Sequence, residues 1–130
     1  KVQTLDECLI IIPKKIYNKL QFDEINCDNW HLYAVDYCLS VQKMGYQAFV
    51  LPLPCYHQST GHSSGFLSDS YFATLKKLQR KHRLDYRIIY TTMGNWRTAI
   101  PLGIQRMKIW RIAFSSIYKI IAFVEEKRNL

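Results

Sequence analysis

The fold of this chain depends most on one stretch, which runs from Phe22-Asp23-Glu24 through Trp30-His31-Leu32-Tyr33-Ala34-Val35-Asp36 and Gly45 to Tyr56-His57-Gln58-Ser59. The pattern predicts a turn, a helix and a strand, with an aspartate and two histidines delivered to the ends of these elements. Polar groups buried within an element cost on the order of several kcal/mol each unless they are paired. The stretch therefore indicates a functional site, with Asp36, His31 and His57 as its candidates.

Local signals along the chain predict alternating strands and helices. Apolar runs predict strands at residues 9–12, 46–51 and 86–91. Helices are predicted at residues 14–20, from Asp28 or Asn29 to Gly45, from Ser68 or Asp69 to about Arg83, and over residues 104–126. In the longer helices apolar residues recur at spacings of three and four, which is typical of helices that cover a core. This order of elements favours an α/β fold.

Length and composition favour a single folded domain in a reducing compartment. The chain has 130 residues, of which 48% are hydrophobic and only five are glycine. The four cysteines form no CxxC pair and lie in or beside apolar segments, so we expect structural thiols. No signal peptide is recognisable, and the location expected is the cytoplasm. Because the chain begins with Lys1 and soon enters an apolar segment, we also expect it to be a piece of a longer protein.

Positive charge is concentrated in the second half of the sequence. Residues 1–60 carry five Lys and Arg against six Asp and Glu, whereas residues 61–130 carry 13 against four. We therefore expect an anionic partner to meet the second half. The predicted helix at residues 104–126 is basic and amphipathic, so it either lies at a membrane interface or packs on the rest of the protein. It contains too many charges for a good transmembrane span.

Each candidate residue also has a structural explanation. His57 follows a predicted strand, where a neutral imidazole can bind a divalent metal or a phosphate, but a single histidine is more often only hydrogen-bonded. Trp30 beside His31 can form a stacking platform for a sugar or a base, or it can pack against the helix start. Asp36 either faces solvent or accepts hydrogen bonds in a cleft. Sequence alone leaves these alternatives open.

Five motifs together resemble a known family. They are Leu5-Asp6 before the apolar run, the Phe22-Asp23-Glu24 turn, a helix that ends in Gly45-Tyr46, Pro52 at a strand end, and His57 followed by Ser59. In order and spacing they are similar to the second half of family-2-like GT-A glycosyltransferases, over about residues 2–62. The sequence Trp30-His31-Leu32-Tyr33 resembles that of a bacterial subgroup of this family. Each motif is weak by itself, but five in register are fairly specific.

The resemblance assigns roles position by position. Asp36 matches the second aspartate of the family's EDxD motif, while the aspartate that serves as base in inverting members corresponds to Ala34, and the glutamate to Tyr33. Glu7 stands where the family often has glycine. Either the base has moved, with Asp36 and His31 as catalytic candidates, or the protein is inactive. His57 matches a histidine that helps to hold Mg²⁺ or Mn²⁺ in many members, and the substrate-binding candidates are Asp6, Trp30 and Tyr33.

The fold expected from the resemblance is the C-terminal portion of a GT-A, Rossmann-like domain with a mixed sheet at residues 1–99, followed by a basic amphipathic helix at 100–130. The function expected is sugar transfer from a nucleotide-sugar donor to a saccharide or lipid-linked acceptor, in polysaccharide or glycolipid synthesis at the inner face of the membrane. No Asp-x-Asp triplet occurs in the sequence, so we expect this part alone to be inactive. The alternative is a non-catalytic basic module that binds anionic membrane or nucleic acid, although no nucleic-acid motif is present.

Overall fold

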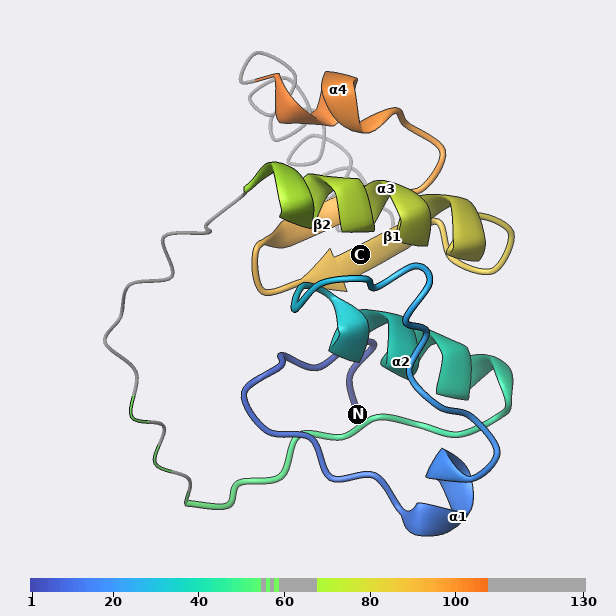
Figure 1. Ribbon diagram of the computed structural model, residues 1–130, viewed down its shortest axis with the longest axis vertical. Helices are drawn as coiled ribbons and strands as arrows, with labels where there is room; N and C mark the ends of the chain where they lie inside the picture. The colour runs from blue at the N-terminus through green and yellow to red at the C-terminus, as the bar shows by residue number, and fades with distance from the viewer. Residues whose placement is uncertain (55, 57, 59–67, 108–130) are drawn as a thin grey trace, which may run out of the picture. The chain divides into compact units, whose positions relative to one another are not determined.

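The structure is a computed structural model that describes residues 1–54, 56, 58 and 68–107 (Figure 1). Its contacts divide the chain into two compact units, Lys1–Ala99 and Ile100–Leu130. Within the described residues there are four helices and one antiparallel sheet of two strands. The chain is therefore a small mixed α/β structure, and the larger mixed sheet of the prediction is not seen in the described residues.

Helix α2, Tyr33–Lys43, supplies a large part of the core of the first unit. The helix begins three to four residues later than predicted, and Asn29 instead uses its Oδ1 atom to accept a hydrogen bond from the His31 amide at 2.8 Å. Leu32 precedes the first turn in a left-handed conformation, with φ of 63°. At the other end Gly45 has φ of +86°, which a glycine adopts without strain, as the sequence predicts.

Helix α3, Asp69–His82, confirms the prediction made from its cap and its apolar spacing. The Ser68 hydroxyl accepts a hydrogen bond from the Tyr71 amide at 3.2 Å, which satisfies one of the free donors at the helix start. The apolar residues predicted to share one side are all buried, and they are Tyr71, Phe72, Leu75 and Leu78. Local signals were sufficient here because both the cap and the stripe lie within the element.

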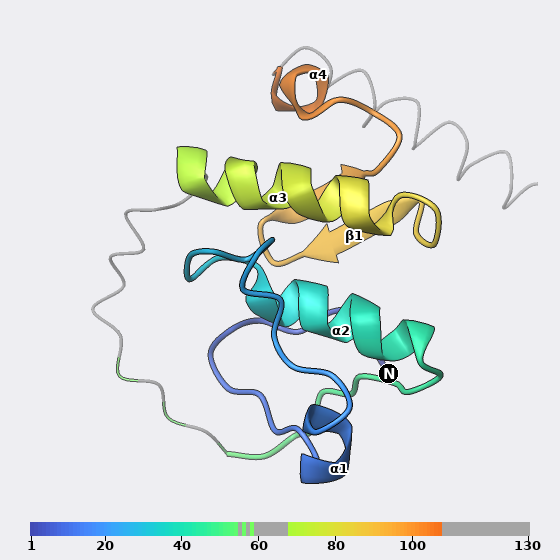
Figure 2. The ribbon, with the colours of Figure 1, turned by 45° about the vertical axis from the view of Figure 1, so that its right-hand side comes forward.

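A hairpin of β1, Ile88–Thr91, and β2, Gly94–Arg97, packs against α3 (Figure 2). Its buried face carries Ile89 opposite Trp96, and the Trp96 ring meets the Phe72 ring edge to face at 5.7 Å between centroids. The predicted strand at 86–91 is confirmed over its last four residues. The sequence Met93-Gly94-Asn95-Trp96 predicts a turn, but Gly94 already belongs to β2, so the turn lies earlier, at residues 92 and 93.

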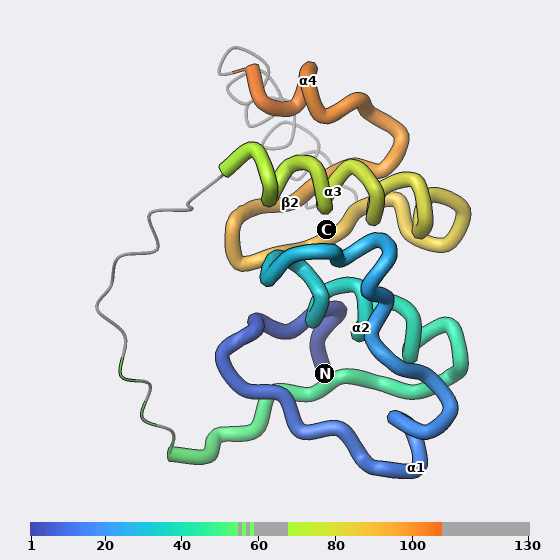
Figure 3. The backbone as a smooth tube through the Cα atoms, viewed as in Figure 1, coloured from blue at the N-terminus to red at the C-terminus, as the bar shows by residue number. Residues whose placement is uncertain are grey.

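Two other predicted strands do not form. Residues 9–12 and 46–51 have no strand structure. In the described part of the chain the pairing near them is a single bridge between Val2 and Ala48. Figure 3 traces the backbone of both segments. Leu9 is 62% exposed and Ile11 is 75% exposed, so this apolar run does not form the buried strand that its composition favours. An apolar run becomes a strand only when neighbouring strands satisfy its backbone, and the described residues supply none there.

Two short helices complete the described structure. Helix α1, Lys14–Tyr17, is a single turn within the predicted helix at 14–20. Helix α4, Leu102–Arg106, belongs to the second unit and ends at Met107, whose backbone is extended. The predicted helix at 104–126 is therefore not continuous through Met107, and its remainder lies outside the described residues. No helix in the described ranges is both long and apolar enough to cross a membrane.

Candidate functional site

A pocket of about 560 Å³ opens beside the first residue of α2. Its lining combines aromatic, acidic, basic and aliphatic side chains from segments that are distant in sequence, namely Glu7, Cys8, Leu9, Ile10, Ile12, Lys14, Tyr17, Phe22 and Tyr33. This volume is within the range typical of small-molecule sites. The pocket thus joins the N-terminal segment, α1, the turn at 22–24 and the start of α2.

Phe22 fixes the aromatic wall of the pocket. Its ring lies 5.5 Å from that of Tyr33 in an edge-to-face arrangement and 4.8 Å from that of Tyr37, measured between centroids. The Tyr37 hydroxyl donates a hydrogen bond to the Leu20 carbonyl at 2.9 Å, which ties the segment before Phe22 to α2. The Tyr17 ring lies 6.2 Å from that of Phe22, also between centroids. Aromatic contacts of this kind hold the pocket wall in a defined geometry.

Glu7 is the most unusual polar group of the pocket. Its Oε1 atom is buried and has no hydrogen-bond partner among the described residues. Burial raises the pKa of Glu7 to about 7, and a hydrogen bond and charge repulsion from the adjacent Asp6 act in the same direction, against the amide hydrogen bonds of Glu7 and Leu32. A carboxyl group with this pKa exists in both protonation states near neutrality. It is suited to proton transfer.

A second group of charged residues joins α2 to α3. The two carboxylate oxygens of Asp36 are both engaged, one by His82 Nε2 at 2.7 Å and the other by Lys81 Nζ at 2.8 Å. Lys81 also contacts Asp23 at 2.7 Å, so the turn at 22–24 is held by the same amine. We call Asp23, Asp36, Lys81 and His82 the interhelical cluster. Because the Asp36 side chain is only 3% exposed, these partners supply the hydrogen bonds that water cannot.

Hydrogen bonding decides the protonation of Asp23 and Lys81. Burial alone raises the pKa of Asp23, but hydrogen bonds from Lys81 and Asn26 outweigh it and hold the pKa well below its usual range. Burial alone lowers the pKa of Lys81, yet its hydrogen bonds to Asp23 and Asp36 raise it overall. Asp23 also accepts from the amides of Ile25 and Asn26 through Oδ1. The cluster therefore organises the turn as well as the helices.

His31 and Trp30 form a third arrangement at the start of α2. The His31 ring is buried and its Nε2 atom lies 3.1 Å from Ser68 Oγ. The Trp30 ring is 64% exposed and stacks on His31 with 3.8 Å between centroids. Burial lowers the pKa of His31, which favours the neutral imidazole. His31 thus links the segment before α2 to the cap of α3, and Trp30 presents an open ring face.

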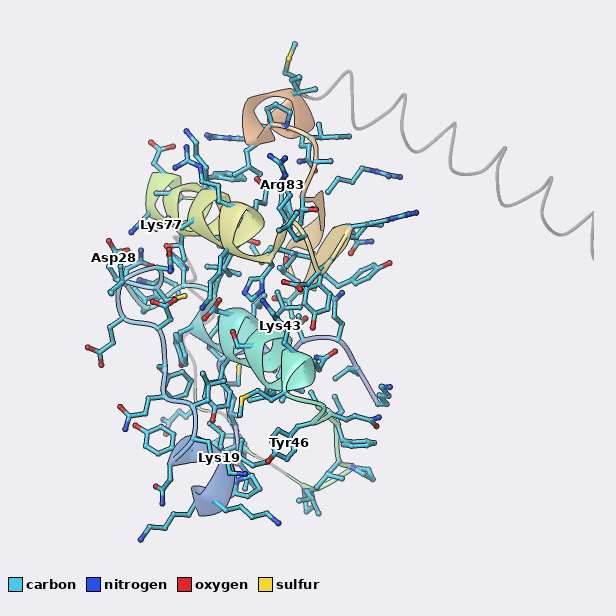
Figure 4. All side chains as sticks on the ribbon, turned by 90° about the vertical axis from the view of Figure 1, so that its right-hand side faces the viewer. Lys19, Asp28, Lys43, Tyr46, Lys77 and Arg83 are labelled. Atoms are coloured by element: carbon cyan, nitrogen blue, oxygen red, sulfur yellow. The ribbon has the colours of Figure 1, made fainter. Side chains whose placement is uncertain are left out.

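A surface ion pair also joins α3 to the segment before α2. Lys77 of α3 contacts Asp28 at 2.7 Å, and Figure 4 shows the two side chains close together. The hydrogen bond to Lys77 lowers the pKa of Asp28. Pairs this exposed contribute little to stability by themselves.

The structure distributes the predicted site residues over these three arrangements. Tyr33 lines the pocket, and Asp6 accepts a hydrogen bond from the Glu7 amide at 2.7 Å beside it. Trp30 and His31 are stacked together, whereas Asp36 lies in the interhelical cluster. His57 lies outside the described residues.

Sequence reasoning did not assign roles to Glu7 or Lys81. Helical spacing places Lys81 on the side opposite the apolar stripe of its helix, yet its Nζ atom contacts two carboxylates. The helical position of Lys81 does not reveal those acids, because they come from other segments. Glu7 did carry a signal, since an acid replaces glycine directly after Asp6.

The described residues contain no group of three or more His, Cys, Asp or Glu side chains arranged to hold a metal ion. They therefore offer no observed fit for the Mg²⁺ or Mn²⁺ expected from the resemblance, and we derive no step through a metal.

Comparisons with protein-family models, curated proteins and solved structures found no match to this chain.

Proposed function

We propose that the chain is the acceptor-side part of a GT-A-like glycosyltransferase, which transfers a sugar from a nucleotide-sugar donor to an acceptor hydroxyl. One observation carries this proposal. Residues beside or within three of the motifs, Glu7, Phe22 and Tyr33, come together around a single pocket. They are separated by 15 and 11 positions in the sequence. Their convergence supports a common role in binding.

The chemistry of the pocket suits a saccharide. Sugar rings present C–H faces that pack on aromatic side chains and hydroxyl groups that hydrogen-bond to carboxylates. Tyr17 and Phe22 supply the aromatic surface, and Glu7 with the neighbouring Asp6 supplies carboxyl oxygens. Trp30, which is exposed and stacked on His31, lies outside the pocket lining and offers a separate ring face for a sugar. In this proposal the pocket holds the acceptor rather than the nucleotide.

The pocket does not contain the residues that are expected to bind the nucleotide-sugar donor. The resemblance places His57 near the diphosphate and a divalent metal. Charge that develops on a leaving diphosphate is stabilised by cations, and basic side chains can contribute to this. Residues 100–130 would bring the protein to a membrane that carries lipid-linked acceptors, at its cytoplasmic face.

A different class of function has its own supporting observation. Helix α3 exposes Lys76, Arg80 and Arg83, and Arg83 is visible at its end in Figure 4. An exposed basic helix can bind an anionic membrane without any catalysis. This alternative predicts binding to anionic vesicles and no release of nucleotide.

The test uses the polypeptide encoded by the entire reading frame. UDP-, GDP- and dTDP-sugars are each incubated with a saccharide library, and nucleoside diphosphate release is measured together with the mass of the acceptor. We expect transfer that Tyr17→Ala weakens through a rise in acceptor KM of up to about tenfold, with Tyr17→Phe close to wild type.

Tyr17 is suited to this test because it lines the pocket and is 39% exposed, so its truncation leaves the core intact. Asp85→Asn serves as a control, since among the described residues the Asp85 side chain forms an exposed ion pair with Lys43. Absence of transfer for every donor and acceptor, with vesicle binding retained, would replace the transferase by the membrane-binding module.

A further inference from the structure

The proposed transferase needs a base that removes the proton from the acceptor hydroxyl, and the resemblance does not identify that residue. The family's base position is occupied by Ala34, which has no ionisable group and is fully buried. Asp36 is buried with both carboxylate oxygens engaged by Lys81 and His82. His31 is buried with its Nε2 atom at hydrogen-bond distance from Ser68. Each of these candidates is either unable to accept a proton or already engaged elsewhere.

Glu7 has the properties that these residues lack. Its side chain lines the pocket, and its Oε1 atom is buried without a hydrogen-bond partner in the described part of the chain. A buried polar atom without a partner is costly. Because Oε1 is itself buried, the Glu7 carboxylate must rotate toward the pocket before a bound hydroxyl satisfies it.

The position of Glu7 also fits. The Tyr33 hydroxyl donates a hydrogen bond to the Glu7 carbonyl at 3.4 Å, and Tyr33 directly precedes Ala34. Glu7 is therefore held against the helical turn that carries the base in the resembling family, but it comes from a different segment of the chain.

We propose that Glu7 is the general base, and that it acts on an acceptor hydroxyl bound in the pocket formed with Tyr17, Phe22 and Tyr33. This assignment rests on the proposed function and deepens it, because it names the group that activates the acceptor. The pocket then serves both to orient the acceptor and to hold its base.

The step balances with the two substrates of the proposed reaction. The acceptor O–H bond breaks and its proton passes to the Glu7 carboxylate. The oxygen electron pair forms a bond to the anomeric carbon of the donor sugar. The bond from that carbon to the diphosphate oxygen breaks, and its electron pair leaves with the nucleoside diphosphate. No oxidant, reductant or further reactant is needed.

The pKa of Glu7 also supports its assignment as the base. Burial and the neighbouring Asp6 bring the pKa of Glu7 to about 7, so near neutrality a substantial fraction is deprotonated while its conjugate acid still forms readily. The wild-type rate should therefore rise with pH through about 7 and then level off. Base catalysis of this kind contributes roughly 10²–10⁴-fold.

The experiment compares Glu7→Gln with wild type in the full-length protein, using the donor and acceptor found by the transfer assay. We expect kcat to fall by about 10²–10⁴-fold, acceptor KM to stay within about threefold, and the pH limb near 7 to disappear. Glu7→Ala with added formate should recover part of the lost rate, because a small carboxylate can enter the space left by the side chain. A purely structural role would not produce either the lost limb or the rescue.

The two proposals fail in different ways. If wild type transfers sugar and Glu7→Gln keeps kcat within about threefold with an unchanged pH limb, the base assignment is overturned and the transferase stands. The base assignment is also overturned if Glu7→Ala loses activity and formate restores none of it. If wild type transfers no sugar, both proposals are overturned. Asp85→Asn, also a carboxylate-to-amide change, should match wild type throughout.

Discussion

Two carboxylates of the first unit are shielded from solvent to different extents, since Asp36 is buried and Glu7 is half-buried, and their hydrogen bonding also differs. Asp36 in the interhelical cluster has a cationic or imidazole partner on each oxygen. Glu7 in the pocket has one oxygen with no partner in the described residues. The first arrangement connects helices, and the second leaves a group able to exchange a proton. Burial of an acid therefore indicates function only when its hydrogen bonds are incomplete.

The largest effect is expected at Asp36, whose two carboxylate oxygens both have partners. Asp36→Ala leaves His82 buried without its carboxylate and removes one of the two acids that hold Lys81. We expect a loss of about 3–5 kcal/mol in the free energy of unfolding, which is a large part of the stability of an ordinary domain. Urea denaturation of the 130-residue chain measures it. A loss below about 1 kcal/mol would show that the cluster does not connect the helices.

The next effect concerns Glu7, whose Oε1 atom has no partner in the described residues. Here the substitution is expected to raise the free energy of unfolding rather than to lower it. The pKa of Glu7 is raised in the folded chain from 4.5 to about 7, so folding favours its neutral form. Wild type should lose stability as the pH rises from about 4.5 through 7, whereas Glu7→Gln should not. At pH 8 we expect the variant to be more stable by about 1–2 kcal/mol, a value reduced for solvent screening of this half-buried group. Thermal unfolding at about pH 4 and about pH 8 tests this, and equal differences at both values would contradict it.

A smaller effect is expected at Ser68, which contacts both the start of α3 and His31. Ser68→Ala removes the cap of α3 and the partner of His31 Nε2 at once. We expect a cost of about 1 kcal/mol, within the range measured for other helix caps. Ser68→Thr keeps a hydroxyl and should recover most of it, as followed by urea unfolding. A cost shared equally by both variants would assign the effect to shape rather than to hydrogen bonding.

The smallest effect on the free energy of unfolding is expected from an exposed ion pair. Lys43 and Asp85 lie 2.7 Å apart, but their side chains are 44% and 36% exposed. Asp85→Asn should therefore change the free energy of unfolding by less than about 0.5–1 kcal/mol, and less still at high salt. Unfolding in about 50 mM and about 1 M salt provides the measurement. A change as large as that of Asp36→Ala would remove the contrast between buried and exposed carboxylates.

The elements that sequence predicted best are those whose signals are local. In α3 the Ser68 cap and the stripe of Tyr71, Leu75 and Leu78 lie within one helix, and all of them behave as predicted. Gly45 likewise reports its own backbone conformation. The runs at 9–12 and 46–51 were mispredicted as strands because pairing depends on other segments.

The candidate site follows the same division. The sequence singled out Tyr33 and the turn at Phe22, because they belong to motifs. It could not show that Lys81 reaches across to Asp23 and Asp36, since spacing along α3 contains no information on facing residues. The importance of Glu7 was visible only as an acid in place of a glycine.

By itself the sequence determined the limits of α3, the left-handed position at Gly45 and the segments that belong to the motifs. These depend on backbone preferences and on hydrogen bonds within a few residues. Only the tertiary structure decided that Asp36 is satisfied and that Glu7 is not. That distinction depends on how residues distant in sequence remove water from a carboxylate and on whether they supply donors in its place.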